Sequence, residues 1–155
     1  MRGIFVLALF GALLAGCGDK SKSEHKKFVD RADAICQAYG QAFRQIPQPP
    51  DPTAPVQVAP HLQRFVPLLK AENDRLGRLV PPAKDESNMK LFLAVQGAQV
   101  TFAERARAAA ARGKQAQMQS ELARWQATIG QANQVGRRLG FSVCAGVVGT
   151  TTTGQ

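Results

Sequence analysis

The stretch QAQMQSELARWQATIGQANQVGRRL, residues 115–139, decides the fold of this chain. Its apolar side chains recur at alternating steps of four and three residues, which is the spacing of one face of an amphipathic helix. The members of this stripe are Met118, Leu122, Trp125, Ile129, Ala132, Val135 or Gly136, and Leu139. Gly140 follows and is expected to end the helix. A stripe of this kind has to pack against other helices, as in the seam of a bundle.

Three earlier segments repeat the pattern. A helix over about residues 24–46, with Ser23 as its N-cap, collects Phe28, Ala32, Ile35, Tyr39, Phe43 and Ile46 on one face. A helix over about residues 56–79 does the same with Val58, Leu62, Phe65, Val66, Leu69, Leu76 and Leu79. A helix from Asp85 or Glu86 to just before Gly113 does so with Met89, Phe92, Val95, Gln99, Phe102, Ala106 and Ala109.

Prolines separate these helices. The run of residues 47–52 and the pair Pro81-Pro82 cannot continue a helix, because proline lacks the backbone donor and fixes φ. Pro67 falls inside the second helix, where it predicts a kink or break near residues 63–67. It is read as a feature of packing, with a functional hinge as the alternative.

Four amphipathic helices with short connections predict an all-α fold, an antiparallel up-down four-helix bundle over residues 24–144. Residues 145–155 carry no charge and are rich in threonine and glycine. They are expected to form a disordered tail.

The N-terminus has the features of an export signal. Met1-Arg2 is a short basic leader, residues 4–14 are apolar, and Leu14-Ala15-Gly16-Cys17 ends the run. The run is too short for a membrane-spanning helix, which needs about 20 apolar residues. Leu14 to Cys17 resembles the lipobox of bacterial lipoproteins. That resemblance implies a signal peptide over residues 1–16 and a lipid on Cys17. The alternative is an ordinary secretory signal with an incidental cysteine.

Cleavage after Gly16 would leave 139 of the 155 residues, and loss of Arg2 would reduce the net charge from +9 to +8. Residues 17–23 are expected to form a polar tether, which at full extension of its last six residues reaches about 20 Å. The domain would therefore lie near the bilayer. Its basic charge favours anionic neighbours but defines no site.

Two cysteines remain if Cys17 carries lipid. An oxidising compartment makes a disulfide between Cys36 and Cys144 the expected outcome. In an up-down bundle, this pairing requires residues 141–143 to fold back along the first helix, or that helix to overhang the bundle.

Three short motifs carry a further resemblance. The stretches Ala32–Cys36 (ADAIC), Pro81–Ala83 (PPA) and Leu139–Cys144 (LGFSVC) are similar to those of small uncharacterised bacterial helical lipoproteins. The resemblance covers most of the mature chain and implies a disulfide-stapled helical bundle. It implies no activity.

Signals for catalysis or metal binding are nearly absent. His25 and His61 belong to no zinc-ligand motif and are read as lone surface histidines. The motif around Ser142, GFSVC, departs from the nucleophile elbow at its last residue and follows no strand, so Ser142 is read as a loop residue. Asp30 and Asp33 could pair for acid/base work, or simply keep an outer face solvated. The chain is expected not to be an enzyme and to need no metal or cofactor. A haem held between His61 and Met89 or Met118 is a remote alternative.

Basic residues surround the turn between the third and fourth helices. They are Arg105, Arg107, Arg112, Lys114 and Arg124, with Glu104 and Glu121 as the nearby acids. This surface is a candidate site for an anionic envelope component or an acidic protein. The alternative is that these charges only keep alanine-rich helices soluble. Nucleic acid is not expected as a partner, because aromatic side chains do not interleave with the basic ones.

These observations favour a non-enzymatic lipoprotein that binds or scaffolds at the extracytoplasmic face of a bacterial membrane. The alternative is a carrier or sensor that houses a small apolar ligand or haem inside the bundle, with Pro67 letting the helices part.

Overall fold

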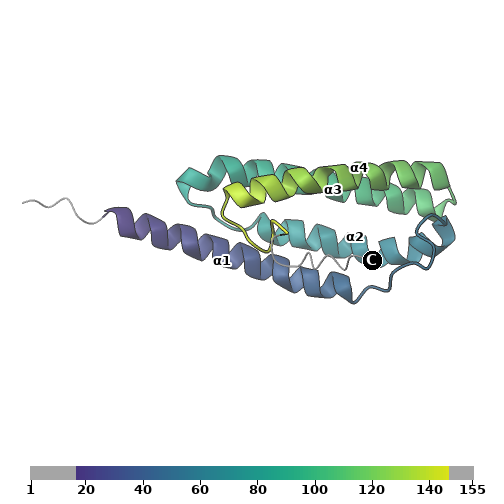
Figure 1. Cartoon of the computed structure of the whole chain (residues 1–155), viewed down its shortest axis with the longest axis horizontal. Helices are drawn as coiled ribbons and strands as arrows, with labels where there is room; N and C mark the ends of the chain where they lie inside the picture. The colour runs from purple at the N-terminus through teal and green to yellow at the C-terminus, as the bar shows by residue number, and fades with distance from the viewer. Residues whose placement is uncertain (1–16, 147–155) are drawn as a thin grey trace, which may run out of the picture.

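The computed structural model describes residues 17–146, which form a bundle of helices packed against one another (Figure 1). The helices are α1 (Cys17–Arg44), α2 (Pro55–Leu76), α3 (Glu86–Ala111) and α4 (Gln115–Arg138), with a short 3₁₀ helix, η1 (Ala83–Asp85), before α3. The described range contains no strand. The expected all-α, four-helix architecture is therefore confirmed. The expected signal peptide, residues 1–16, lies outside the described residues.

The helix pairs are packed unequally. Helix α3 makes the most extensive contacts, with α4 and with α2, and α1 packs mainly on α2. The α1–α2 loop and the α3–α4 turn lie at one end of the molecule, and the connection that contains η1 lies at the other (Figure 1). Within residues 17–146, no helix combines the length and apolar character needed to cross a bilayer.

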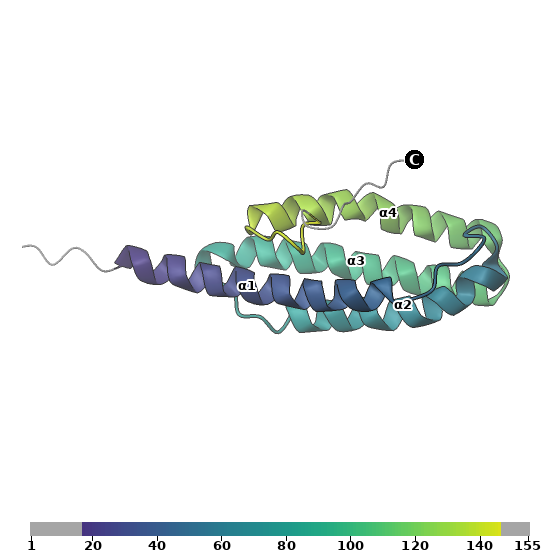
Figure 2. The same ribbon diagram turned by 60° about the horizontal axis from the view of Figure 1, so that its bottom comes forward.

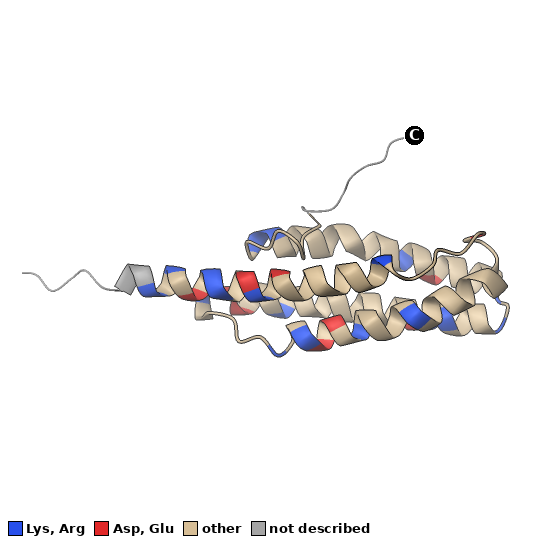
Figure 3. Ribbon diagram, turned by 90° about the horizontal axis from the view of Figure 1, so that it is seen from below, with Lys and Arg blue, Asp and Glu red and all other residues tan. Residues whose placement is uncertain are grey.

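Helix α1 begins earlier than the sequence pattern predicts. Residues 17–23 are its first turns rather than an extended tether, and Ser23 does not start the helix. This segment contains no proline, and a Lys26–Asp30 ion pair of 2.7 Å supports the turn that follows. The first turns extend beyond the other helices (Figure 2). Acidic and basic residues are interspersed along this half of α1 (Figure 3).

Helix α2 is continuous through Pro67, so of the predicted kink or break the break does not occur, and the kink stays a prediction. The side chain of Pro67 is exposed, while Val66 and Leu69 on either side of it are buried. Because packing holds the helix on both sides, the loss of one backbone hydrogen bond does not interrupt it. The helix ends at Leu76, and Leu79 packs on the core from the connection that follows.

The core has two apolar clusters. One lies toward the η1 end and includes Phe28, Leu76, Met89, Phe92 and Leu139. The other lies toward the α3–α4 turn and includes Val58, Leu62, Val66, Ala106 and Met118. Most predicted stripe residues belong to one of them. Phe102 is an exception, since it is only half-buried and Ala103 beside it takes the core position.

Polar side chains lie between the two clusters along the helices. Glu72 on α2 and Gln99 on α3 are exposed by only 9 % and 6 %. On α4 the middle of the stripe, Leu122, Trp125 and Ile129, is only half-buried. The interior is therefore apolar at both ends and polar in the middle.

The chain after α4 turns back onto α1. Gly140 has φ +79°, and the Phe141 N–H donates to the carbonyl of Gly136 at 3.0 Å, which is the geometry of a glycine-terminated helix. Phe141 then packs between Phe28 and Phe92, with ring centroids 5.6 and 5.4 Å away. This is the fold-back that a Cys36–Cys144 bridge requires.

The disulfide between Cys36 and Cys144 is present and joins positions 108 residues apart. Both routes considered from the sequence occur together, because residues 141–143 fold back and α1 also overhangs the bundle (Figure 2). The predicted start of the disordered tail, residue 145, is too early in the chain, because Ala145 is buried against Gly136. Residues 147–155 of that tail lie outside the described part of the chain.

Candidate ligand-binding site

A cavity lies in the seam between α1 and α4. These two helices are not packed backbone against backbone, so side chains alone close the gap. We call the gap the seam cavity and divide it into two chambers of about 340 Å³ each. Phe43 of α1 and Trp125 of α4 line both chambers, which therefore adjoin.

The first compartment, the polar chamber, reaches into the middle of the bundle. Its lining includes Gly40 and the disulfide from the α1 side, Glu72 from α2, Gln96 and Gln99 from α3, and Asn133 from α4. Its polar residues come from the layer between the two apolar clusters. The chamber therefore owes its position to the interruption of the core.

Glu72 dominates the chemistry of the polar chamber. Burial raises the pKa of its carboxyl from 4.5 to about 7. Within residues 17–146, no ion pair or side-chain hydrogen bond involves this carboxyl. A buried carboxyl without a partner is unfavourable by several kcal/mol when ionised, which is why such groups are rare in cores.

Two further polar groups nearby lack partners. The side chain of Gln99 forms no hydrogen bond with the rest of the described chain. The indole N–H of Trp125 is buried and also unpaired among these residues. Buried polar groups are usually hydrogen-bonded, and a cluster of unsatisfied ones calls for water or a ligand.

The second compartment, the aromatic chamber, lies toward the α1–α2 loop. Phe65 is at its centre, 4.9 Å from the ring of Phe43 and 5.6 Å edge-on from Trp125. Leu122 completes the apolar wall, and His61 stacks on Phe65 at 5.8 Å. Flat or compact apolar groups are favoured in such a compartment.

Neither histidine is a lone surface residue, which corrects the interpretation from the sequence. Nδ1 of His61 lies 3.0 Å from the carbonyl oxygen of Pro47, and Nδ1 of His25 lies 2.7 Å from the buried carboxyl of Asp85. The described residues contain no cluster of three or more metal-ligating side chains. Met89 and Met118 belong to the apolar clusters and do not line the chamber that contains His61. The arrangement thus places no methionine opposite His61 for a haem.

Asp30 and Asp33 do not form an acid/base pair. Asp30 pairs with Lys26, whereas the Asp33 carboxylate accepts hydrogen bonds from the backbone N–H groups of residues 142–144 at 2.9, 2.9 and 3.1 Å. The Ser142 hydroxyl donates to it as well, at 2.6 Å. Asp33 therefore holds the segment that carries Cys144, and Ser142 is a structural donor.

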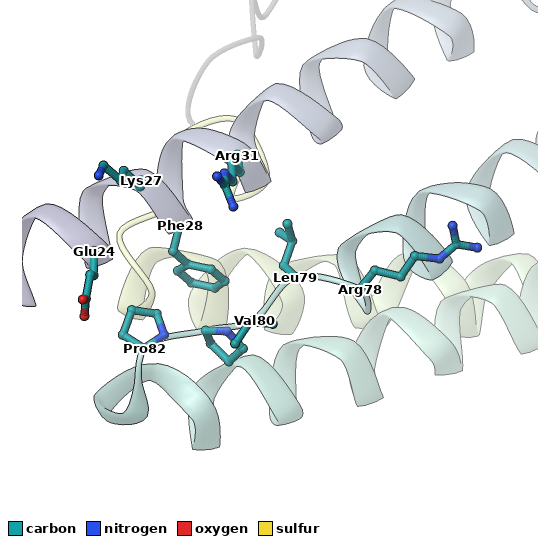
Figure 4. A pocket seen from close by; sticks show the side chains of 9 residues that line it. Glu24, Lys27, Phe28, Arg31, Arg78, Leu79, Val80 and Pro82 are labelled. Atoms are coloured by element: carbon teal, nitrogen blue, oxygen red, sulfur yellow. The ribbon is translucent and has the colours of Figure 1, made fainter.

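A second surface hollow, of about 380 Å³, lies between α1 and the connection after α2 (Figure 4). Its charged residues, Glu24, Lys27, Arg31 and Arg78, are all exposed, and Val80 is 89 % exposed. Because water already solvates these groups, nothing there calls for a ligand. The seam cavity is the stronger candidate.

The predicted basic surface is present in part, since Arg105 and Arg112 lie on nearly the same face of α3. Arg105, Arg112 and Lys114 are exposed, but Arg107 is half-buried and lies roughly 200° around α3 from Arg105. Arg124 is 3.7 Å from the carboxylate of Glu121, whose side chain is largely buried. The partner assigned to this surface stays a prediction. The same holds for the lipid on Cys17, which is the first residue of α1.

Sequence reasoning missed Glu72, although a signal was present. Position 72 lies three residues after Leu69 and four before Leu76, so it shares their inward face. A glutamate at an inward position departs from the apolar pattern, and such departures are expected at functional or strained sites. The sequence pattern correctly predicts that Gln99 faces inward. It does not show that Gln99 lies in the same polar layer as Glu72.

Comparison of this chain with family models, with curated proteins and with solved structures finds no significant match.

Proposed function

We propose that the protein is a non-enzymatic lipoprotein, anchored through Cys17 at the extracytoplasmic face of a bacterial membrane, which binds a small ligand in the seam cavity. Its four helices follow one another in an antiparallel, up-down order. Helix α1 then belongs both to the anchor and to the binding site, since Gly40 and Phe43 line the seam.

The observation that carries the binding function is the buried carboxyl of Glu72, which lines the polar chamber beside Gln99 and has no ion-pair or hydrogen-bond partner among residues 17–146. Replacing Glu72 and Gln99 with apolar residues would remove the cost of burying these polar side chains, which for Glu72 is expressed in its raised pKa. A bundle selected only for stability has no reason to keep them. The presence of Glu72 and Gln99 beside an open, aromatic-lined space supports a ligand that supplies partners for these two side chains.

Two features support the anchor. Leu14 to Cys17 has the residues of a lipobox, and the disulfide suits an oxidising compartment. Two or more acyl chains would anchor the protein stably, whereas one would not. Phe28 is eleven residues after Cys17 on the same helix, so a helical stalk of roughly 16 Å would separate the lipid from the apolar core.

A space-filling substitution tests the binding function. A Cβ atom at Gly40 would meet only the Arg44 side chain, at 3.8 Å, so there is room for a leucine that fills the polar chamber. Gly130 is the matched control, since it is exposed on α4 and has nothing within 4 Å. Each glycine-to-leucine change should stabilise its helix by about 0.5–1 kcal/mol.

The probe is adamantanol, a compact neutral alcohol, followed through the fluorescence of Trp125, the single tryptophan of the chain. We expect Gly40→Leu to weaken binding by at least about tenfold, which corresponds to 1.4 kcal/mol, and Gly130→Leu to leave it unchanged. Equal affinities in the wild type and Gly40→Leu would show that the seam is not the binding site.

A further inference from the structure

We infer that the ligand of the seam cavity is an organic cation, a protonated amine on a compact apolar body, with the Glu72 carboxylate as its counter-ion. This inference rests on the proposed ligand-binding function and adds the charge and orientation of the ligand.

The charges around the polar chamber favour a cation. Glu72 is the titratable residue in its lining, because Cys36 and Cys144 form the disulfide and the remaining side chains are apolar or neutral. No lysine or arginine of the described chain lines the chamber. The lining itself therefore supplies no positive partner for Glu72, and a cationic ligand would. An anionic ligand would meet the unfavourable like charge of Glu72.

Neutral acceptors complete the environment that an ammonium group needs. A protonated primary amine has three donors and no acceptor. The Glu72 carboxylate can take one of them, and the side-chain oxygens of Gln96 and Gln99 on the adjacent helix are available in the same lining. Three acceptors on two neighbouring helices match the three donors.

The aromatic chamber suits the rest of such a molecule. Phe43 and Trp125 stand where the two chambers meet, and aromatic faces attract cations within about 6 Å of the ring centroid. Beyond them, Phe65 and Leu122 provide an apolar surface for the body of the ligand. The site is therefore acidic and polar at one end and apolar at the other. An amphipathic amine is complementary to it, because its positive group can lie at the acidic end and its apolar body at the apolar end.

The raised pKa of Glu72 couples binding to proton release. Below about pH 7 the carboxyl of the empty protein is mostly protonated, and a cation binds well only after that proton leaves. Other charged groups on the surrounding helices include Asp33 and Arg44 on α1, the Lys70–Asp74 pair on α2, Glu104 on α3, and the Glu121–Arg124 pair on α4. None of them lines the polar chamber, and neither does His61, which lines the aromatic chamber.

Three probes share the adamantane skeleton and differ in the charge of one substituent: adamantylamine, adamantanol and adamantanecarboxylate. Comparing their affinities separates the effect of ligand charge from the effect of ligand shape. Their affinities are measured by Trp125 fluorescence and by calorimetry for the wild type, Glu72→Gln and the control Glu104→Gln, which alters an exposed carboxyl on α3. Circular dichroism confirms beforehand that each variant is folded.

We expect the wild type at about pH 8 to bind the amine at least tenfold more tightly than the alcohol, and the carboxylate most weakly. Glu72→Gln should remove the preference for the amine and leave the alcohol unchanged, whereas Glu104→Gln should behave as the wild type. Below about pH 7 the affinity for the amine should fall up to tenfold per pH unit, with close to one proton released per amine bound near pH 6.

Equal binding of amine and alcohol by the wild type, or a preference for the amine that survives in Glu72→Gln, would overturn the inference and leave the ligand-binding function intact. Failure of all three probes to bind would overturn both.

Discussion

Position 72 carries a carboxyl group where the face of α2 that bears Leu69 and Leu76 calls for an apolar side chain. Burial without a partner favours the neutral form of Glu72 and raises its pKa to about 7. The same shift links protein stability to pH. Below the unfolded-state pKa of 4.5 the carboxyl is protonated in both states and has no effect on stability. As pH rises toward 7, the unfolded chain loses the proton first, so folding becomes less favourable.

Replacing Glu72 with glutamine should remove this penalty. We expect Glu72→Gln to raise the free energy of unfolding by up to about 3 kcal/mol at about pH 8 and by much less near pH 4.5, as chemical denaturation at several pH values would measure. Glu104→Gln is the control and should show no pH-dependent difference. A constant effect of Glu72→Gln across this range would mean that the carboxyl does not ionise differently in the folded protein.

Asp33 illustrates what sequence reasoning at the level of single residues could not supply. Its spacing from Asp30 suggested either an acid/base pair or a solvated face, but its partners come from residues 142–144. Contacts between positions more than 100 residues apart depend on the tertiary fold. Glu72, by contrast, was within reach of the sequence, because the periodicity of α2 already places it inward.

At the scale of helices, the sequence predicts well what depends on periodicity and poorly what depends on spacing between elements. The four stripes were sufficient to predict four helices, and glycines 113 and 140 both follow helix ends with positive φ. The helical state of residues 17–23 was missed because a short polar segment fits a tether and a helix equally well. The gap between α1 and α4 could not be predicted at all, since it depends on the distance between the two helices.

Helix α1 depends on the disulfide more than the other helices do. It packs mainly on α2, while the bridge from Cys36 to Cys144 and the hydrogen bonds of Asp33 join it to the segment after α4. Closing a loop of 108 residues stabilises a protein by up to about 4–5 kcal/mol in the loop-entropy description.

Replacing Cys36 and Cys144 with serine should therefore lower the melting temperature by more than about 10 °C. Hydrogen exchange should accelerate in α1 more than in α3, because α3 keeps its contacts with both neighbours. Reduction of the wild-type protein should reproduce both effects. A melting temperature unchanged by reduction would show that the bridge does not hold the fold.

At the scale of the whole molecule, one helix joins a proposed lipid to a proposed binding site. The lipidated N-terminus would lie at one end of α1, and the seam cavity lies along the other half of the helix, around Gly40 and Phe43. An amphipathic amine partitions to membrane surfaces because its polar and apolar parts are separate. A helical stalk of fixed length would hold the seam close to such a surface.

Protein isolated from the native host should begin at Cys17 and carry the mass of a diacylglyceryl group, with residues 1–16 absent. Intact-mass measurement tests this directly. Substitution of Cys17 by alanine should prevent acylation and release the protein from the membrane fraction. A product that still begins with Met1, or that has no added lipid mass, would refute the anchor.

The long sequence separation within the disulfide has a consequence for biogenesis. In a chain that crosses a membrane with its N-terminus first, Cys36 emerges 108 residues ahead of Cys144. Its thiol would stay unpaired until Cys144 has also crossed. During that interval the thiol of Cys17 could form a non-native disulfide with Cys36. Acylation would prevent this, because it converts the sulfur of Cys17 into a thioether. Correct pairing would then depend on the lipid-transferring enzyme acting before the thiol oxidase.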